Sequence, residues 1–340
     1  MSVYIYSAKR TPLGAFNGAL ATVPATQLGS LTISAAMQDS GFDQSLIDEC
    51  IMGNVLTSAN GQAPARQAAL GAGLPEAVPC LTINKVCGSG LKAVMLGADS
   101  ILLGNTRAAV VGGMENMSLA PHLMLKSRRG YRMGAVTLED ALLKDGLIDA
   151  YTGQHMGNFA ELCVRNYNFS RQQQDEFAIA SYQKAIKAQA ENLYAQEIVA
   201  VEVQHRKGTE TVSEDEEPKR VNFDKIALLP PAFEKDGTIT AANASKINDG
   251  AAALVLADES LGSETTAKPL AKIIAHSTFA QKPELFTTAP VYAMQDLLAK
   301  THKKASDIDL YEINEAFSVV TMAAQQELSL KDTQINVHGG

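Results

Sequence analysis

Apolar and polar residues follow one another along this chain in a pattern that predicts alternating strands and helices. An apolar run ends at Val86 and is followed by the tight, glycine-rich segment 87–90. Apolar residues at helical spacing then continue over residues 91–102, and a second apolar run covers residues 108–111. This order predicts a strand, a turn, a buried helix and another strand. The turn places Cys87 at the start of the predicted helix.

The same reading predicts further elements on either side. Residues 3–7 are typical of a strand, and residues 24–40 of a helix that ends at Gly41. Residues 47–54 predict a strand that leads into a polar loop. A capping box, Ser170 to Gln173, begins a predicted helix that carries Ile179, Tyr182 and Ile186 on one face. The chain is therefore predicted to be mixed α/β.

Two pairs of segments are similar and suggest a weak internal duplication. Residues 308–315 are similar to residues 47–54, and the pair Ile335-Asn336 repeats the pair Ile83-Asn84. Residues 119–240 differ in character, with more charge, Gln, Tyr and Phe. We therefore expect a doubled α/β body with an insertion, in which the second copy stops where the Cys87 helix begins in the first.

Composition and charge exclude several classes of protein. The 340 residues are 46% hydrophobic with a net charge of −8, and the pI is near 5.3. No long basic stripe is present, so we expect neither nucleic acid nor an anionic membrane as a partner. No run of 18 apolar residues occurs, and the first residues read as a strand rather than a signal peptide. Four cysteines without C-x-x-C spacing indicate a reducing, cytoplasmic location and no metal site.

Cys87 has the surroundings of a nucleophile. At a helix N-terminus, free backbone N–H groups and the helix dipole stabilise a thiolate, and Gly88 and Gly90 leave room for a substrate carbonyl. The alternative is a small buried residue that packs under the helix. We expect a depressed pKa and faster reaction with iodoacetamide than at Cys50, Cys80 or Cys163.

Five motifs together resemble those of the thiolases in order and spacing. They are NKVCGSGLKAV (84–94), GGMENMSLAPH (112–122), QHMG (154–157), AANASKINDGAAA (241–253) and NEAF (314–317). Within the family, the segments DEEPKRVNF, ITAANAS and APVYA are most similar to the acetyl-CoA acetyltransferase branch.

The resemblance implies a five-layered αβαβα body made of two similar halves. Residues 1–118 with 241–268 would form the N-terminal half, and residues 119–240 an inserted loop domain that covers coenzyme A. Residues 269–340 would form a C-terminal half that is incomplete.

The implied activity is acyl transfer: two acetyl-CoA condense to acetoacetyl-CoA and CoA, and the reverse thiolysis uses the same acetyl-Cys87 intermediate. The substrates are CoA thioesters, and no cofactor is implied. Alternatives are a degradative 3-ketoacyl-CoA thiolase and a non-catalytic acyl-CoA-binding homologue. A ketoacyl synthase would use two histidines and lack the long insertion, so it is disfavoured.

Site residues follow from the same motifs. Cys87 matches the nucleophile and Asn314 the residue that holds an oxyanion-hole water; without the resemblance, Asn314 reads as a strand-end turn residue. The implied substrate and CoA contacts are His155, Met156, Arg220, Phe233, Ala244, Ser245, Ala316 and Phe317. Met156 would favour a short acyl group, whereas the alternative for Phe233 and Phe317 is ordinary core.

The chain departs from the family pattern in two places. The family's base histidine and second catalytic cysteine lie in GHP and C-x-G-G-G motifs that are absent, and His338 belongs to the turn before the first of them. We therefore expect a truncated chain that is unstable and inactive. Pro218 stands where potassium-activated relatives carry a tyrosine, which puts a potassium site in doubt although Ala241, Ala242 and Ala244 offer carbonyls. The family also implies a cytoplasmic homodimer or homotetramer in fatty acid metabolism.

Overall fold

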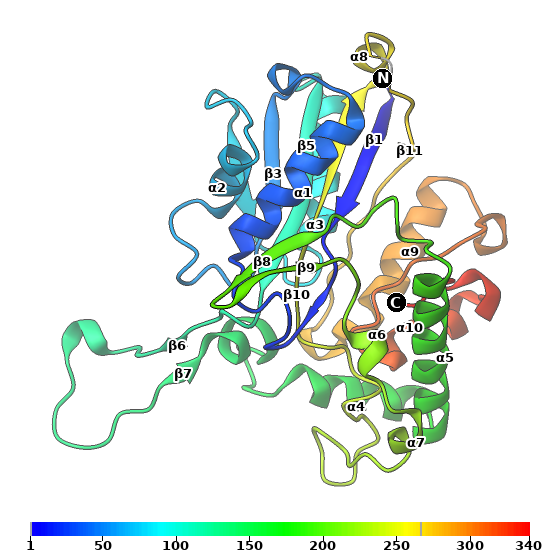
Figure 1. Ribbon diagram of the computed structural model, residues 1–340. Coiled ribbons are helices and arrows are strands. Elements are labelled where there is room, and N and C mark those ends of the chain that lie inside the picture. Colours follow the sequence, from blue (N-terminus) through cyan, green and yellow to red (C-terminus); the bar gives the residue numbers. More distant parts are fainter. Residues whose placement is uncertain (1, 266) are drawn as a thin grey trace. The chain divides into compact units, whose positions relative to one another are not determined.

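A computed structural model describes residues 2–265 and 267–340, which divide into two compact units (Figure 1). The first unit consists of Met1–Gly146, Ala195–Glu216 and Ile247–Ile274. The second consists of Leu147–Tyr194, Glu217–Lys246 and Ala275–Gly340. These boundaries follow compactness, whereas the division predicted above follows the duplication and stays a prediction.

The first unit is built on a mixed sheet. Its strand order is β11 (Ala271–Ile273), β1 (Val3–Arg10), β10 (Asn248–Asp258), β5 (Ala108–Asn116), β3 (Glu49–Gly53) and β4 (Cys80–Ile83), with β2 (Gly14–Ala15) paired to β10. Strand β3 runs parallel to both β4 and β5. The pairs formed by β1 and β10 are antiparallel. The parallel edge of the sheet therefore leads into the Cys87 turn, which follows β4.

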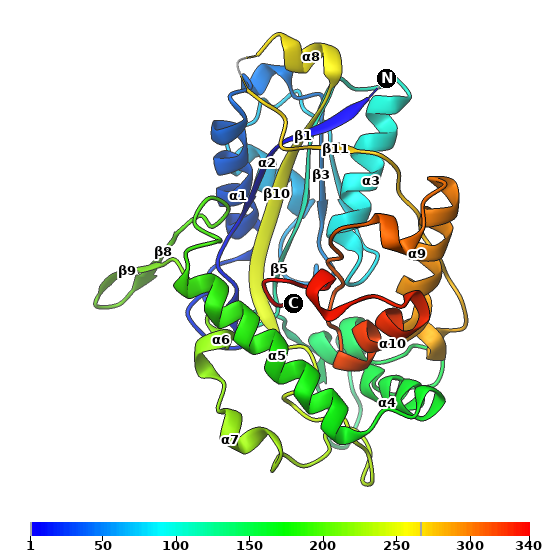
Figure 2. The ribbon, with the colours of Figure 1, turned by 90° about the vertical axis from the view of Figure 1, so that its right-hand side faces the viewer.

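Helices cover both faces of this sheet. Helices α1 (Ala25–Ser40) and α2 (Pro64–Gly71) pack on one face, and α3 (Ser89–Leu102) packs on the other (Figure 2). Side chains alternate along β5, so Ala108 and Val110 join the cluster under α1, while Ala109 and Val111 join the cluster under α3. Burial on both faces explains why residues 108–111 read as a continuous apolar run.

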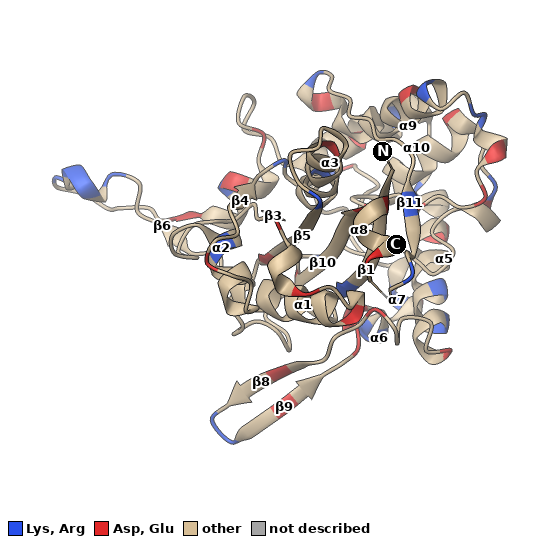
Figure 3. Cartoon of the chain, turned by 90° about the horizontal axis from the view of Figure 1, so that it is seen from above, with Lys and Arg blue, Asp and Glu red and all other residues tan. Residues whose placement is uncertain are grey.

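Two hairpins extend from the first unit (Figure 3). One is formed by β8 (Val201–His205) and β9 (Gly208–Val212). The other, formed by β6 (His122–Leu123) and β7 (Glu139–Asp140), carries a 3₁₀ turn at Ser127–Arg129 with blue basic residues near its tip. We call residues 119–143 the apolar arm, because it exposes Leu119, Met124, Leu125, Tyr131, Met133, Val136, Leu138 and Leu143.

The second unit is helical. Its helices are α4 (Met156–Tyr167), α5 (Arg171–Ala190), α6 (Glu217–Arg220), α7 (Phe223–Ile226), α9 (Ala289–Lys300) and α10 (Ser318–Leu328), with 3₁₀ turns at Pro283–Thr288, Ala305–Asp307 and Asp332–Gln334. Every residue from Ser318 to Ala324 is buried, so α10 is the central helix of the unit. Around it, α4 contributes Ala160, Cys163 and Val164 to one core cluster.

Most predicted elements are confirmed. The strand, turn, helix and strand around Cys87 are present, and α1 ends at Gly41 in the left-handed conformation with φ +67°. The predicted burial of the helix after Cys87 holds only in part, because Leu91 and Leu102 of α3 are exposed. The Ser170–Gln173 capping box begins α5. Ile179, Tyr182 and Ile186 of α5 are half-buried. The buried face carries Gln174, Asp175, Ala178, Ser181 and Ala188, because polar side chains there fix a neighbouring loop.

The duplicated segments pair in the same sense. In the first unit, Gly53 of β3 lies opposite Ile83 of β4 in a parallel pair. In the second unit, residues 308–315 form no strand, yet Tyr311 makes a parallel bridge with Ile335. Both segment pairs are therefore parallel but differ in register, and the duplication stays a prediction. In the described part of the chain, no helix is long and apolar enough to cross a bilayer.

Candidate active site

Cys87 lies in a turn between β4 and α3 that its neighbours hold by hydrogen bonds. The Ser89 hydroxyl donates to the Val86 carbonyl at 2.6 Å and accepts from the Lys85 N–H at 2.8 Å. The Val86 N–H donates to Asn84 Oδ1 at 2.9 Å. These contacts close the turn on both sides of Cys87, whose side chain is exposed.

The turn is strained at Val86. Its φ is +48°, a left-handed conformation that is unfavourable for a β-branched residue and is retained only where the surroundings enforce it. Gly53 at the end of β3 is part of those surroundings. A Cβ on Gly53 would lie 2.6 Å from the Ser89 Cβ, so only glycine lets the first turn of α3 approach the sheet.

The predicted depression of the Cys87 pKa is wrong. Desolvation by the surrounding chain raises the pKa of this thiol, and only its own backbone N–H acts in the opposite direction. The thiol that gains acidity is Cys80, whose pKa is lowered to about 7 by a hydrogen bond from Cys50 and by Arg66. A position ahead of a helix therefore does not outweigh lost hydration when no charged side chain acts on the thiol.

The second unit brings many of the predicted binding residues together around three aromatic rings. The His155 and Phe233 rings stack with centroids 4.7 Å apart, and Phe233 meets Phe317 edge to face at 5.9 Å. Phe317 is buried, Phe233 is half-buried, and both pack with Met156, Ala244 and Ala316 in one apolar cluster. We call the three rings of His155, Phe233 and Phe317 the aromatic bed.

His155 also caps helix α4. Its ring Nδ1 accepts the Gly157 N–H at 3.0 Å, and the His155 backbone N–H donates to Asn158 Oδ1 at 3.1 Å. Asn158 in turn donates to the Phe233 carbonyl at 3.2 Å. A Cβ on Gly157 would lie 2.2 Å from the Phe233 ring. Gly157 and Asn158 therefore position the stacked pair, a role that only the capping pattern of the QHMG segment could have suggested.

The loop that carries Ala244 and Ser245 is tied to the segment that begins α10. Ala244 forms an antiparallel bridge with Phe317, and the Ser245 N–H donates to the Ala316 carbonyl at 3.0 Å. The Ser318 N–H donates to the Asn243 carbonyl at 2.9 Å. These backbone contacts bring Ala244, Ser245, Ala316 and Phe317 into one small area and leave the Ser245 side chain exposed.

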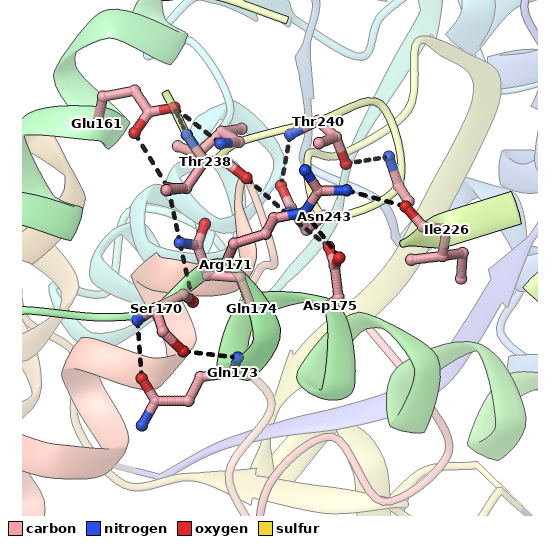
Figure 4. Close-up of polar contacts among 12 residues, drawn as sticks. Glu161, Ser170, Arg171, Gln173, Gln174, Asp175, Ile226, Thr238, Thr240 and Asn243 are labelled. Carbon is pink, nitrogen blue, oxygen red and sulfur yellow. Dashed lines mark hydrogen bonds and ion pairs between the residues drawn. The ribbon is translucent and has the colours of Figure 1, made fainter. Parts of the chain in front are cut away.

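Buried polar side chains of α4 and α5 hold this loop by hydrogen bonds (Figure 4). Glu161 of α4 accepts from the Thr238 and Ile239 N–H groups, each at 2.7 Å. Asp175 of α5 accepts from the Asn243 side chain at 2.9 Å and pairs with Arg171 at 2.7 Å. Sequence reasoning missed this network because its members are far apart in the chain.

Asn314 is exposed, and hydrogen bonds hold the residues on either side of it, Ile313 and Glu315. Asn336 donates to the Ile313 carbonyl at 2.8 Å and to Glu315 at 2.6 Å, and it accepts from the Ile313 N–H at 2.8 Å. The Ser181 hydroxyl donates to Glu315 at 2.7 Å. Burial raises the pKa of Glu315, against the opposing effect of these two hydrogen bonds. Buried Asn336 therefore holds the backbone on both sides of Asn314.

Arg220 lies apart from the aromatic bed on the short helix α6. Its exposed guanidinium is 3.9 Å from Glu217. Nearby, the Lys246 ammonium donates to the Ala241 carbonyl and lies 6.0 Å from the Tyr182 ring centroid. The Ala241 carbonyl, which the sequence suggested as a free oxygen ligand for potassium, is thus already used by a lysine.

Each unit keeps its own part of the predicted site, Cys87 in the first and the other residues in the second.

Comparisons with known proteins place these features in one family. The thiolase N-terminal domain matches residues 3–260, and the thiolase C-terminal domain matches residues 267–340. An acetyl-CoA acetyltransferase from Schizosaccharomyces pombe is 50% identical over 340 residues, which cover 99% of this chain and 86% of that protein. A probable acetyl-CoA acetyltransferase from Dictyostelium discoideum is 48% identical, covering 100% of this chain and 82% of its own length.

A solved structure gives the same result. The crystal structure of a thiolase from Ascaris suum in complex with coenzyme A is similar with a TM-score of 0.95 and 43% identity, covering 100% of this chain and 87% of that one. The predicted thiolase fold is therefore confirmed, and these matches lend no support to the expectation that the chain is inactive. With both domains matched and half of the residues shared with a relative, the chain belongs to the thiolase family.

Proposed function

We propose that this protein is an acyltransferase that condenses two acetyl-CoA to acetoacetyl-CoA and CoA, and that catalyses the reverse thiolysis. The observation that carries the proposal is the exposed Cys87 thiol, held in a strained turn before α3. Two relatives that share about half of their residues with this chain are named as acetyl-CoA acetyltransferases or probable ones. Fold alone would not support a specific reaction, whereas a nucleophile in a defined turn does.

The first half of the reaction transfers the acetyl group to Cys87. The bond between the acetyl carbon and the CoA sulfur breaks, a bond to Cys87 Sγ forms, and the thiol proton leaves with the released CoA. In the second half, the α-carbon of another acetyl-CoA loses a proton and attacks the acetyl-Cys87 carbonyl. That attack returns the sulfur of Cys87 as a thiol and leaves acetoacetyl-CoA.

The second unit supplies surfaces suited to the coenzyme. The pantetheine arm is neutral and flexible, and the aromatic bed of His155, Phe233 and Phe317 offers it an apolar surface. Ser245 is exposed beside that bed and can contact the arm, while exposed Arg220 can contact the nucleotide or its phosphates. Exposed Asn314 can hold a water that donates to the oxyanion formed at the acyl carbonyl.

The proposal is tested by trapping the intermediate. The protein is incubated briefly with radiolabelled acetyl-CoA, quenched in acid and digested with trypsin. We expect one labelled peptide, residues 86–92, which contains Cys87 alone among the cysteines. Cys87→Ala should abolish the label, whereas Cys163→Ala, at a buried cysteine on α4, should keep it. Label on any other cysteine peptide of the wild-type protein would contradict the proposal.

Chain-length preference separates this activity from degradative thiolysis. Met156 is half-buried at the start of α4 beside the aromatic bed, so we expect faster thiolysis of acetoacetyl-CoA than of a six-carbon 3-ketoacyl-CoA. An apolar pocket discriminates by about 1–3 kcal/mol per methylene unless a wall excludes the longer chain. Met156→Ala should reduce the ratio of the acetoacetyl-CoA rate to the six-carbon rate by about tenfold. Equal rates for both substrates in the wild-type protein would favour the degradative alternative.

We also propose a homo-oligomer, a dimer or tetramer, that needs no cofactor and acts in the cytoplasm in fatty acid metabolism. The apolar arm, residues 119–143, supports the homo-oligomer because it exposes a series of large apolar side chains along one hairpin. The composition and the absence of cysteine pairing patterns support the location. Light scattering would test the assembly, and Met133→Glu with Leu125→Glu should shift it to smaller species.

A further inference from the structure

Two cysteines outside the proposed mechanism lie opposite one another in the sheet of the first unit. Cys50 of β3 and Cys80 of β4 are register partners in the parallel pair, next to a backbone bond from the Cys50 N–H to the Pro79 carbonyl at 3.0 Å. Neighbouring strands are about 4.8 Å apart, which is within the separation of about 4.4–6.8 Å that a disulfide spans between Cα atoms. Both side chains contact the core cluster under α1 and α2, so they share one face of the sheet.

The two thiols are unequal. Cys50 is fully buried, whereas Cys80 is partly exposed on the edge strand β4. Arg66 of α2 is anchored beside them, with its guanidinium donating to the Val78 carbonyl at 3.1 Å and to the Glu76 carbonyl at 3.0 Å. Cys80 is thus accessible to a small reagent and lies close to a fixed positive charge, while Cys50 lies behind it.

The electrostatics agree with this geometry. A hydrogen bond from the Cys50 thiol, together with Arg66, lowers the pKa of Cys80 to about 7 against the effect of burial. The same hydrogen bond raises the pKa of Cys50, as does its burial. At neutral pH about half of Cys80 is therefore thiolate, and the protonated form donates to the Val78 carbonyl at 3.4 Å, whereas Cys50 stays protonated.

We propose that Cys50 and Cys80 form a reversible thiol–disulfide pair, in which Cys80 reacts with a hydroperoxide and Cys50 resolves the product. The Cys80 sulfur attacks one peroxide oxygen, so that an S–O bond forms, the O–O bond breaks and water leaves. The Cys50 sulfur then attacks the Cys80 sulfur, the S–S bond forms and the S–O bond breaks with loss of a second water. The two thiols lose two electrons and two protons, and hydrogen peroxide is reduced to two waters.

Tryptic mapping tests the pair directly, because each cysteine lies in its own peptide. Cys50 is in residues 11–66, Cys80 in 67–85, Cys87 in 86–92 and Cys163 in 145–165. The reduced full chain is exposed to a small excess of hydrogen peroxide at pH 7, blocked with N-ethylmaleimide and digested without reductant. We expect peptide 11–66 joined to peptide 67–85 as the main disulfide product, and its loss on treatment with dithiothreitol.

Variants separate this chemistry from a structural effect. Cys50→Ala should leave Cys80 oxidised to sulfinic acid with no linked peptide, and Cys163→Ala should give the wild-type product. Arg66→Gln should slow alkylation of Cys80 at pH 7 several-fold and leave the rate at Cys163 unchanged; because this change removes the tryptic site, Cys80 is then read from fragment ions of the joined peptide 11–85. In urea, the 11–66/67–85 link should lose its dominance, because the strand pairing no longer selects it.

Three results would overturn the proposal. The first is native protein in which Cys80 is oxidised to sulfinic acid while Cys50 remains a free thiol. The second is a dominant link from Cys80 to Cys87, which would show that β3 does not supply the partner. The third is a Cys80 that is alkylated in Arg66→Gln as fast as in the wild-type protein and that no peroxide oxidises.

Discussion

The two units hold their parts of the candidate site by different means. In the first, the backbone fixes Cys87: a positive φ at Val86, a turn closed by Ser89 and a glycine contact at Gly53. In the second, packed and hydrogen-bonded side chains fix the binding surface, with His155, Phe233 and Phe317 in ring contact above a buried polar network. The reactive atom is thus placed by the chain path, and the binding surface by side-chain packing.

This difference has a physical consequence for mutation. The strained turn at Cys87 rests on a few contacts, among them the Ser89 hydroxyl and the Asn84 side chain, so the loss of any one of them should shift the main chain. A packed aromatic surface responds in small steps to each change in volume, because the interior has little free space. Substitutions of groups proposed to contact the reacting atoms should therefore change kcat, whereas substitutions in the packed aromatic surface of the second unit should change KM.

The largest effect is expected at Asn314. Asn314→Ala removes an exposed amide whose neighbours Ile313 and Glu315 remain held by Asn336. We expect kcat for acetoacetyl-CoA thiolysis to fall about 100-fold, as for loss of an oxyanion donor, with the melting temperature unchanged. Asn336→Ala is the matched control and should lower the melting temperature instead. Equal activity in Asn314→Ala and the wild-type protein would exclude Asn314 from catalysis.

An intermediate effect is expected from pH on Cys87. Because desolvation raises the pKa of this thiol, its thiolate fraction should grow about tenfold per pH unit from neutral pH to beyond the usual cysteine value near 8.5. Alkylation of peptide 86–92 by iodoacetamide, followed by mass spectrometry from pH 6 to 10, measures this. A plateau in the alkylation rate below pH 8 would mean that a cation stabilises the thiolate. Cys87 would then depend on a nearby positive charge as well as on the path of the main chain.

The smallest effect is expected at Gly157. A methyl group there would meet the Phe233 ring at 2.2 Å, so Gly157→Ala should displace the stacked pair at a cost of about 1–3 kcal/mol. We expect a several-fold rise in KM for CoA thioesters with kcat nearly unchanged, measured by steady-state thiolysis. Gly153→Ala, outside α4 and without neighbours within 4 Å of its Cβ, controls for glycine loss elsewhere, although its φ of +72° adds local strain. A fall in kcat alone would contradict the assignment of Gly157 to binding.

The sequence predicted the local parts of this molecule well. Hydrophobic period and turn residues located the Cys87 turn, helix α1 with its Gly41 terminus and the Ser170 cap, because these depend on contacts within a few residues. The motifs of the resemblance also picked out His155, Phe233, Ala244 and Phe317, which the second unit brings together.

The features that the sequence did not predict depend on contacts between distant segments. Nothing near Cys87 in the chain reveals that the surrounding fold raises the pKa of its exposed thiol, and nothing near Cys80 reveals Arg66. The Gly157 contact with Phe233 and the Lys246 bond to Ala241 likewise require the folded chain. The polar contacts of α5 also require the folded chain, because Thr238 and Asn243, the partners of Gln174 and Asp175, lie more than 60 residues away.

The cap that His155 gives to helix α4 also decides which of its nitrogens carries a proton. Nδ1 accepts the Gly157 N–H, and burial lowers the pKa of the imidazole, so the neutral ring must carry its hydrogen on Nε2. In that tautomer His155 can donate to an acyl oxygen, but Nε2 has no lone pair with which to remove a proton from a thiol. To act as a base, the ring would first have to release the helix. His155 is therefore a fixed donor, and the bases of the reaction must be sought elsewhere.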